Sequence, residues 1–268
     1  MMAWPWLPQL ASEHGAALDR ALGLVHVLMA LLFVGWGAFF AYALVRFRRK
    51  RNPVADPRGV RSHASTWVEA AVAVAEALLL VGLSMPLWAD RVERLPPPSE
   101  STRVRVVAEQ FAWNVHYPGP DGIFGRTDPA LIDATANPLG LDRKDAAAKD
   151  DVTTINQLHL PANRPALVSL SSKDVIHSFA LQEMRVKQDV IPGIATDVWF
   201  VPKVTTDEMR ARTANPEFNY EISCAQLCGL GHYRMRGFVT IHSPEAFQAW
   251  LDEQQAQLGE SAEDSIWN

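Results

Sequence analysis

Cysteine is scarce in this chain, whose 268 residues include only Cys224 and Cys228. No C-x-x-C-H sequence occurs, which excludes a covalently attached c-type haem. A strongly basic balance is also missing: 30 Asp and Glu stand against 25 Lys and Arg, which argues against nucleic acid as a partner. Long apolar runs are confined to the first ninety residues, and the remainder has the composition of a soluble domain.

Two apolar runs predict membrane-spanning helices. Residues 21–45 contain no charged side chain and are long enough to cross a hydrocarbon core of roughly 30 Å. Residues 66–89 form the second run, with Trp67 and Trp88 at the depths where interfacial aromatics are expected. The basic segment 46–65 between them predicts a cytoplasmic loop. We therefore expect a transmembrane hairpin with both chain ends on the outer side.

The two cysteines lie in the sequence C-A-Q-L-C-G-L-G-H-Y-R-M, residues 224–235, which also contains His232 and Met235. This ligand set favours copper, because a single-copper electron-transfer site uses two His, one Cys and an axial Met. The second cysteine would let two thiolates bridge two copper ions. A second histidine must then come from elsewhere, and His177, among apolar residues of a strand-like run, is the best candidate.

Two other interpretations of the cysteine pair compete with copper. In a domain outside the cytoplasm the two thiols could form a disulfide. A structural zinc site is the other, although zinc sites rarely recruit methionine and a Cys2His2 site would place a second histidine nearby. Met235, the distant His177, and Gly229 and Gly231, which let the loop fold tightly, favour copper.

Short runs that alternate polar and apolar residues predict strands in the exported part. They lie at 102–117, 165–171, 175–182, 196–201, 218–223 and 236–242. A long surface excursion with about one helical turn is expected at 118–156. A copper loop between late strands favours a Greek-key β-sandwich or barrel of the cupredoxin type, so we predict an α+β membrane protein.

Residues 1–20 lack the pattern of a cleavable signal peptide.

A helix is expected to begin at Pro244, with Ser243 as its cap, and to pack on the sandwich through Phe247, Trp250 and Leu251. The last ten residues are polar enough to be loose. The expected divisions are 1–20, an exported N-terminal segment; 21–45, a transmembrane helix; 46–65, a cytoplasmic basic loop; 66–89, a transmembrane helix; 90–101, a Pro-rich linker; 102–243, the cupredoxin domain; and 244–268, a C-terminal helix and tail.

The copper loop, together with D-V-I-H-S-F around His177 and K-Q-D-V-I-P-G at 187–193, resembles subunit II of the haem-copper cytochrome c oxidases. The resemblance covers most of residues 20–255. It implies a dinuclear copper centre, CuA, held by the side chains of His177, Cys224, Cys228, His232 and Met235 and by the backbone carbonyl of Gln226.

The resemblance also implies the electron-transfer subunit of a cytochrome-c oxidase. Its CuA centre would accept electrons one at a time from a separate cytochrome c or a membrane-tethered c-type cytochrome. It would pass them to haem in subunit I, where haem and CuB reduce O2 to water, coupled to proton pumping. Subunit I, other oxidase subunits and membrane lipid are the implied partners, and a bacterial cytoplasmic (inner) membrane with a periplasmic copper domain is the implied location. No residue of this chain would catalyse the oxygen chemistry.

The sequence departs from the family at two positions. Where the family has Q-W-x-W, this chain has Q-F-A-W, so Phe111 replaces the aromatic implicated where electrons enter, while Trp113 is retained. Many members have Glu at the position of Gln226, and that carboxylate also ligates Mg2+. Magnesium is therefore not assigned.

The second apolar run contains Glu69 and Glu76, which lie on nearly one helix face. Membrane carboxyls usually face protein or water. In the resemblance, Glu69 occupies the position of a glutamate near the opening of a proton channel in subunit I, and simple solvation at the membrane surface is the alternative. Glu76 falls where the family tends to have proline, so no role carries over.

Three other functions compete with this interpretation. A quinol-oxidising subunit II lacks the copper ligands that this chain has. A nitric oxide reductase can use such a copper domain and differs in its partner subunit. A membrane-anchored copper-binding protein would hold one exchangeable Cu(I) and would not need all six ligands.

Overall fold

The computed structural model describes residues 7–54, 57–59 and 62–264. It has two compact units, one formed by Ala16–Glu93 and the other by Met1–Gly15 together with Arg94–Asn268. Residues 1–6 of the expected N-terminal segment 1–20 lie outside the described residues. Each unit is described below by itself.

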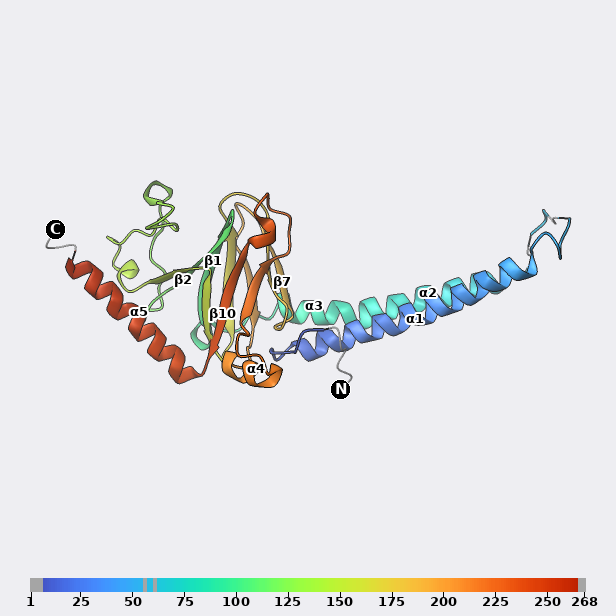
Figure 1. The fold of residues 1–268 in the computed structure, drawn as a ribbon, viewed down its shortest axis with the longest axis horizontal. Coiled ribbons are helices and arrows are strands. Elements are labelled where there is room, and N and C mark those ends of the chain that lie inside the picture. Colours follow the sequence, from blue (N-terminus) through green and yellow to red (C-terminus); the bar gives the residue numbers. More distant parts are fainter. Residues whose placement is uncertain (1–6, 55–56, 60–61, 265–268) are drawn as a thin grey trace. The chain divides into compact units, whose positions relative to one another are not determined.

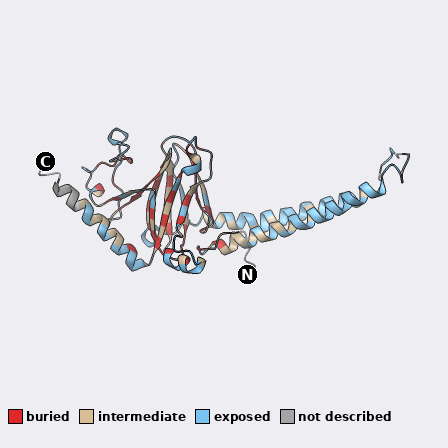
Figure 2. Cartoon of the chain, viewed as in Figure 1, coloured by how far each residue is buried: buried red, intermediate tan, exposed pale blue. Residues whose placement is uncertain are grey.

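Two apolar helical segments make up the first unit (Figure 1). Helix α1 spans Gly15–Arg46, longer at its start than the expected 21–45. The second segment consists of α2 (Ala64–Leu79), a π-helical turn η1 (Leu80–Ser84) and α3 (Met85–Val92). Both segments are long and apolar enough to cross a membrane. They expose their side chains along most of their length (Figure 2), as expected of a surface that lipid would cover.

The π-helical turn was not expected from the sequence. It immediately precedes Pro86, in the first turn of α3, whose ring nitrogen cannot donate a hydrogen bond to the preceding turn. A π-helical turn accommodates one extra residue per turn, which is a common local solution inside an otherwise α-helical segment. The segment therefore continues as one helical run from Ala64 to Val92.

Two five-stranded sheets form the second unit, and they pack as a sandwich. One has the order β3-β2-β1-β5-β8 and the other β4-β10-β9-β6-β7. Neighbours are antiparallel except for β1 with β5 and β10 with β4, which are parallel. The strands are β1 (Thr102–Glu109), β2 (Ala112–Tyr117), β3 (Val152–Ile155), β4 (Gln157–Pro161), β5 (Ala166–Ser172), β6 (His177–Leu181), β7 (Val186–Val190), β8 (Thr196–Phe200), β9 (Tyr220–Cys224) and β10 (Arg236–His242).

The fold class agrees with the prediction of apolar helices followed by a cupredoxin-like sandwich, but the strand list differs. The run at 102–117 is a hairpin of β1 and β2, not one strand, because the chain turns at Gln110 and Phe111, where no Gly or Pro marks the turn. Strands β3, β4 and β7 were not expected, since runs of four or five residues are too short to show a clear alternation.

The core lies between the two sheets, where alternate side chains of each strand meet. Its largest completely buried side chains include Trp113, Phe179, Phe200 and Tyr220. Helix α4 (Thr206–Thr213) begins with a capping box in which Thr205 and Glu208 bond each other's backbone N–H groups.

Helix α5 (Pro244–Asp264) packs on the sandwich by Phe247, Trp250 and Leu251, the face expected from the sequence. It is longer than expected, because residues 259–264 remain helical. Residues 265–268 lie outside the described residues.

The segment before α1 is bonded to the sandwich. The backbone N–H of Ala11 donates to the carbonyl of Glu183 at 2.9 Å, and the N–H of Lys203 donates to the carbonyl of Ala11 at 2.8 Å. The Ser12 hydroxyl donates to the Met184 carbonyl at 2.7 Å. The described residues before α1 are therefore attached to the sandwich.

Candidate metal centre

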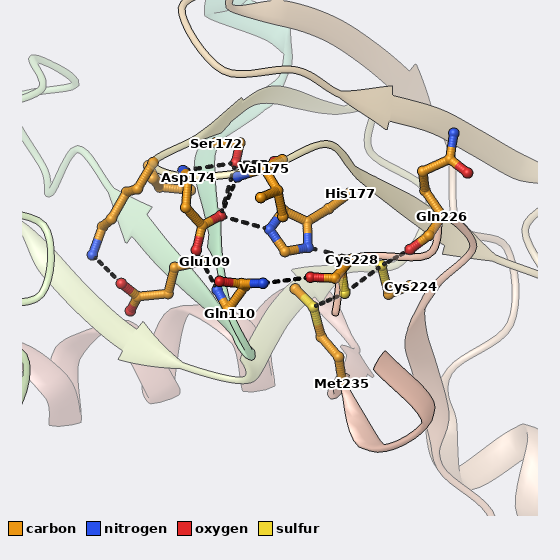
Figure 3. A network of polar contacts seen from close by, with 12 residues as sticks. Glu109, Gln110, Ser172, Asp174, Val175, His177, Cys224, Gln226, Cys228 and Met235 are labelled. Atoms are coloured by element: carbon orange, nitrogen blue, oxygen red, sulfur yellow. Dashed lines mark hydrogen bonds and ion pairs between the residues drawn. The ribbon is translucent and has the colours of Figure 1, made fainter. Parts of the chain in front are cut away.

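His177 begins strand β6 and is completely buried. Its Nε2 lies 2.9 Å from a carboxylate oxygen of Asp174, and its Nδ1 faces the Cys224 sulfur at 3.9 Å (Figure 3). With Nε2–H donating to Asp174, Nδ1 keeps its lone pair for a metal ion. A carboxylate behind a histidine is the usual device that fixes the tautomer and the ring orientation of a metal ligand.

Asp174 is itself held in place by backbone groups. The N–H groups of Gln110 and Val175 each donate to its carboxylate at 2.7 Å. Burial alone would raise the pKa of Asp174, but the hydrogen bonds from His177, Gln110 and Val175 outweigh burial and lower it. The carboxylate therefore stays ionised and can hold the histidine.

The loop after β9 brings the sulfur ligands together. The Cys224 and Cys228 sulfurs lie 3.7 Å apart, and both cysteines are free. Cys228 Sγ is also 3.6 Å from His232 Nδ1 and 3.6 Å from the Met235 sulfur. Ligand atoms of His177, Cys224 and Cys228 all lie within 4.8 Å of one another. The sulfurs are too far apart for a disulfide, whose S–S bond is about 2.05 Å.

These separations fit a metal ion in the group. A zinc–thiolate bond is about 2.3 Å, so two sulfurs 3.7 Å apart can both reach one ion or bridge two. Burial, followed by the neighbouring Cys224 thiol, raises the pKa of Cys228 to about 11. The thiol is therefore protonated at neutral pH in the metal-free protein, and a metal must displace this proton.

Gln226 contributes its backbone and not its side chain. Its carbonyl oxygen accepts from the Cys224 thiol at 3.2 Å, which places the carbonyl beside the sulfur cluster. The side-chain amide points away from the sulfurs (Figure 3). Residue 226 is an amide and not the glutamate that many members of the resembled family have, so it offers no carboxylate for magnesium.

Gln110 joins the two halves of the centre and was not singled out from the sequence. Its backbone N–H holds Asp174, as described above, and its side-chain Nε2 donates to the Cys228 carbonyl at 2.6 Å (Figure 3). A Cβ added to Gly229 would lie 2.6 Å from the same amide nitrogen. One residue of the β1–β2 turn thus touches both the His177 side and the cysteine loop.

The two predicted aromatic residues occupy different positions. Phe111 is half-buried and lies against the loop, since a Cβ on Gly231 would come within 2.4 Å of its ring. Trp113 is completely buried, with its ring centroid 6.1 Å from that of His177 and 5.8 Å from that of Phe179. Trp113 therefore contacts the centre from the core and has no surface at which a partner could touch it.

The outer side of the loop is apolar and exposed. Leu227, Leu230 and Tyr233 are 80%, 97% and 84% exposed. These three alternate with the inward-facing ligands, so the loop carries its metal-ligating groups on one side and apolar side chains on the other. Exposed apolar clusters are common at surfaces where proteins contact one another.

Glu69 and Glu76 lie in helix α2, in the first unit, and both are exposed. The sequence therefore singled out a group of residues that the structure brings together at the candidate metal site, and also a carboxyl, Glu69, in the helical unit. The two groups belong to separate units. Asp174, three residues before His177, is a second residue that the sequence interpretation missed, although an acid at that spacing is a usable signal.

Comparison with known proteins decides the family. The sequence model described as the periplasmic domain of cytochrome c oxidase subunit II matches residues 103–241. An alternative cytochrome c oxidase subunit 2 of Bradyrhizobium diazoefficiens is 31% identical over 98% of this chain and 88% of its own length. The chain belongs to the cytochrome c oxidase subunit II family.

Other relatives carry the same kind of name. The cytochrome c oxidase subunit 2 of Cereibacter sphaeroides is 26% identical over 86% of this chain and 74% of its own length. A crystal structure of the periplasmic domain of cytochrome oxidase subunit II from Bradyrhizobium japonicum covers 62% of this chain and 99% of its own, with 23% identity and a TM-score of 0.42.

Membership in the subunit II family identifies the chain as a subunit II of a haem-copper oxidase. It implies copper binding, and the His177, Cys224 and Cys228 group is a potential copper site. The family description also assigns the sandwich to the outer, periplasmic side, and the two apolar helices are suited to anchor it in a membrane.

Proposed function

We propose that this subunit II holds a dinuclear CuA centre that accepts single electrons from a cytochrome c-type donor and passes them to haem in subunit I. The observation that carries the proposal is the meeting of two free thiols, 3.7 Å apart, with His177, His232 and Met235. A structural site for one ion does not need this many soft ligands. When bound there, a copper pair supplies one-electron redox chemistry with little change in its bonds.

The chain's own residues would hold that centre rigid and dry. Cys224 and Cys228 would hold the ions as thiolates, and His177 and His232 would each contribute Nδ1. Met235 and the Gln226 carbonyl would be weak ligands that adjust the potential. Asp174 fixes the His177 ring, while buried Met235 and Trp113 exclude water from the inner side. A fixed ligand set favours fast electron transfer because little has to move.

The exposed cluster of Leu227, Leu230 and Tyr233 supports coverage of the loop by a partner protein. Phe111 is adjacent to this loop and partly accessible, so we propose that electrons enter near Phe111. Trp113, completely buried against His177, would act only as packing or as part of an internal route.

The arrangement in the membrane is likewise a proposal. Residues 21–45 and 66–89 would cross the membrane as a hairpin, because the basic segment between them favours the cytoplasmic side. Residues 1–20 and 90–268 would then lie outside, with 90–101 as the linker, 102–243 as the copper domain and 244–268 as its C-terminal helix and tail. The implied partners are subunit I, the other oxidase subunits and a separate donor.

The direct test of the function is electron uptake by the assembled oxidase. After rapid mixing with reduced cytochrome c, we expect fast oxidation of the cytochrome in the native complex and its loss in Cys224→Ser. Ser223→Ala, a change at the neighbouring residue that removes no ligand, should retain the fast phase. A full rate in Cys224→Ser would contradict the proposal, as would the absence of uptake in the native complex, which is the behaviour expected of a protein that only delivers copper.

Glu69 is proposed to assist proton uptake, because carboxyls within membrane helices usually face protein or water. We expect Glu69→Ala in the assembled oxidase to lower turnover and proton pumping several-fold. Glu76→Ala, which changes the other carboxyl of the same helix, is the matched comparison. Turnover and pumping that are unchanged in Glu69→Ala would remove this role.

A further inference from the structure

A cavity of about 440 Å³ lies on the outer face of the β3-β2-β1-β5-β8 sheet. Its floor is formed by strands β1 and β5 and its other wall by the surface excursion after β2. The volume is within the range of small-molecule sites in proteins, roughly 300–1,000 Å³. None of the residues that line this cavity is a candidate copper ligand.

The strand register gathers polar groups on the floor. Arg105 of β1 is paired with Ser169 of β5, and Val107 with Ser171, so these side chains alternate on one face. Lys173 follows on the same side, with its Nζ 2.7 Å from a carboxylate oxygen of Glu109. Two cations and two hydroxyls therefore line one surface of the cavity.

Arg105 is held in position but lacks a polar partner. Its guanidinium lies 4.1 Å from the centroid of the Phe124 ring, which in turn packs edge-on against His116. Within the described part of the chain, no carboxylate or carbonyl accepts a hydrogen bond from it. A guanidinium fixed on an aromatic ring, with its five N–H donors unused, is prepared for a planar anion.

Among the described residues, no neighbouring acid bonds to Arg105, although the negative charge of Asp151 acts on it. Glu109 is engaged by Lys173 and by the Asn114 amide. Asp151 is held by His116 and by the Gly125 N–H. Asp197 is paired with Ser169 across β5 and β8, one strand further from Arg105. Burial and then the positive charge of Arg103 lower the pKa of Arg105, and the charge of Asp151 partly opposes them.

The rest of the lining is mostly apolar. Pro129, Ile132 and Leu139 come from the excursion, and Val107 and Ala195 come from the sheet. A ligand that suits both surfaces needs an anionic head and a compact apolar body. We propose that this cavity binds a small organic anion, an aliphatic carboxylate or phosphate ester, whose head contacts Arg105 and Lys173 and whose body lies against the excursion.

Calorimetric titration of the full chain in a nonionic detergent tests the proposal. We expect hexanoate or hexyl phosphate to bind saturably, and the stronger of the two identifies the head group. Hexanol and inorganic phosphate, which lack the head and the body respectively, should bind at least about tenfold more weakly. Arg105→Gln should weaken binding of the anion at least about tenfold, as expected for loss of a charge-assisted contact. Lys187→Gln, which removes an exposed charge on the other sheet, should leave it unchanged.

Ser171→Leu, which fills the cavity without changing charge, gives an independent second variant and should also abolish binding. Absence of saturable binding by both anions, or equal affinity in Arg105→Gln and the native chain, would overturn the assignment. Hexanol binding as tightly as hexanoate would overturn the anionic head, and inorganic phosphate binding as tightly as hexyl phosphate would overturn the apolar body. The copper content of the same samples is a separate measurement, so failure here leaves the electron-transfer proposal untouched.

Discussion

Gln110 shows how a residue outside the ligand set can determine a metal centre. It holds the carboxylate behind His177 through its backbone and the Cys228 carbonyl through its side chain. The ligands come from segments 47 residues apart, His177 and Cys224, and without such a tie each could shift independently. A rigid centre therefore depends on the β1–β2 turn as much as on the loop.

Removing the Gln110 amide should loosen the cysteine loop. We expect Gln110→Ala to weaken copper binding about 10-fold or more, the usual effect of losing an outer hydrogen bond at a metal site. Amide hydrogen exchange of residues 224–235 in the metal-free protein should become faster. Glu109→Gln weakens the adjacent ion pair with Lys173 without touching the loop, and it should change neither measurement. Equal effects in both variants would show that the turn as a whole, and not the Gln110 amide, is responsible.

The candidate ligands in residues 224–235 could be recognised from the sequence because they lie in one short motif with distinctive thiol, imidazole and thioether chemistry. His177, 47 residues before Cys224, was inferred only because a second histidine was needed. Gln110 and Asp174 could not be recognised, since their roles depend on a turn that carries no Gly or Pro and on a contact between distant segments. The burial of Trp113 was also hidden, because the Q-F-A-W sequence does not reveal on which strand face each aromatic lies.

An imidazole–indole stack is one of the contacts that attach helix α5 to the sandwich. The Trp250 ring lies parallel to that of His159, with centroids 4.1 Å apart, and His159 Nδ1 is 2.8 Å from His242 Nε2. The Tyr117 ring packs edge-on against Trp250 at 5.2 Å. Two neutral histidines can share a hydrogen bond in this position, whereas two charged ones would repel each other.

Acid should therefore weaken the α5 contact. Burial, followed by the nearby His242, lowers the pKa of His159 to about 4 from 6.5, and burial also lowers the pKa of His242, which Asp207 partly opposes. The unfolded chain binds these protons first, so the stabilisation is complete above about pH 6.5 and is lost progressively as the pH falls toward 4. Urea midpoints measured by near-ultraviolet circular dichroism should fall over this range.

The matched variant is His159→Asn, which keeps a hydrogen-bonding group but cannot be protonated. Its urea midpoint should be lower than that of the native chain at pH 7, because the stack with Trp250 is reduced, and should decline less between pH 6.5 and 4. A decline as steep as that of the native chain would contradict a role for His159.

The elements differ in how far the sequence determined them. The apolar helices and α5 were predictable because their patterns extend over many residues. The short strands β3, β4 and β7 were not, because each is specified by pairing with a neighbour and not by its own alternation. The π-helical turn before Pro86 depends on a backbone adjustment that the residue pattern does not show.

The molecule as a whole combines a helical unit suited to a membrane with a sandwich that brings distant ligands together. Its family membership rests on residues 103–241 and on a relative aligned over nearly the whole chain. In the proposed function, this chain would hold only an electron-transfer site, and the oxygen chemistry would belong to subunit I. The rest of the sandwich serves to hold Asp174, His177 and the 224–235 loop in register.

Copper analysis of the purified, assembled protein, combined with electron paramagnetic resonance, tests the central claim most directly. We expect two tightly held copper ions per sandwich and a signal in which one unpaired electron is shared by both nuclei. A single exchangeable copper ion, or a sulfur–sulfur bond joining Cys224 to Cys228 in the active assembly, would contradict it.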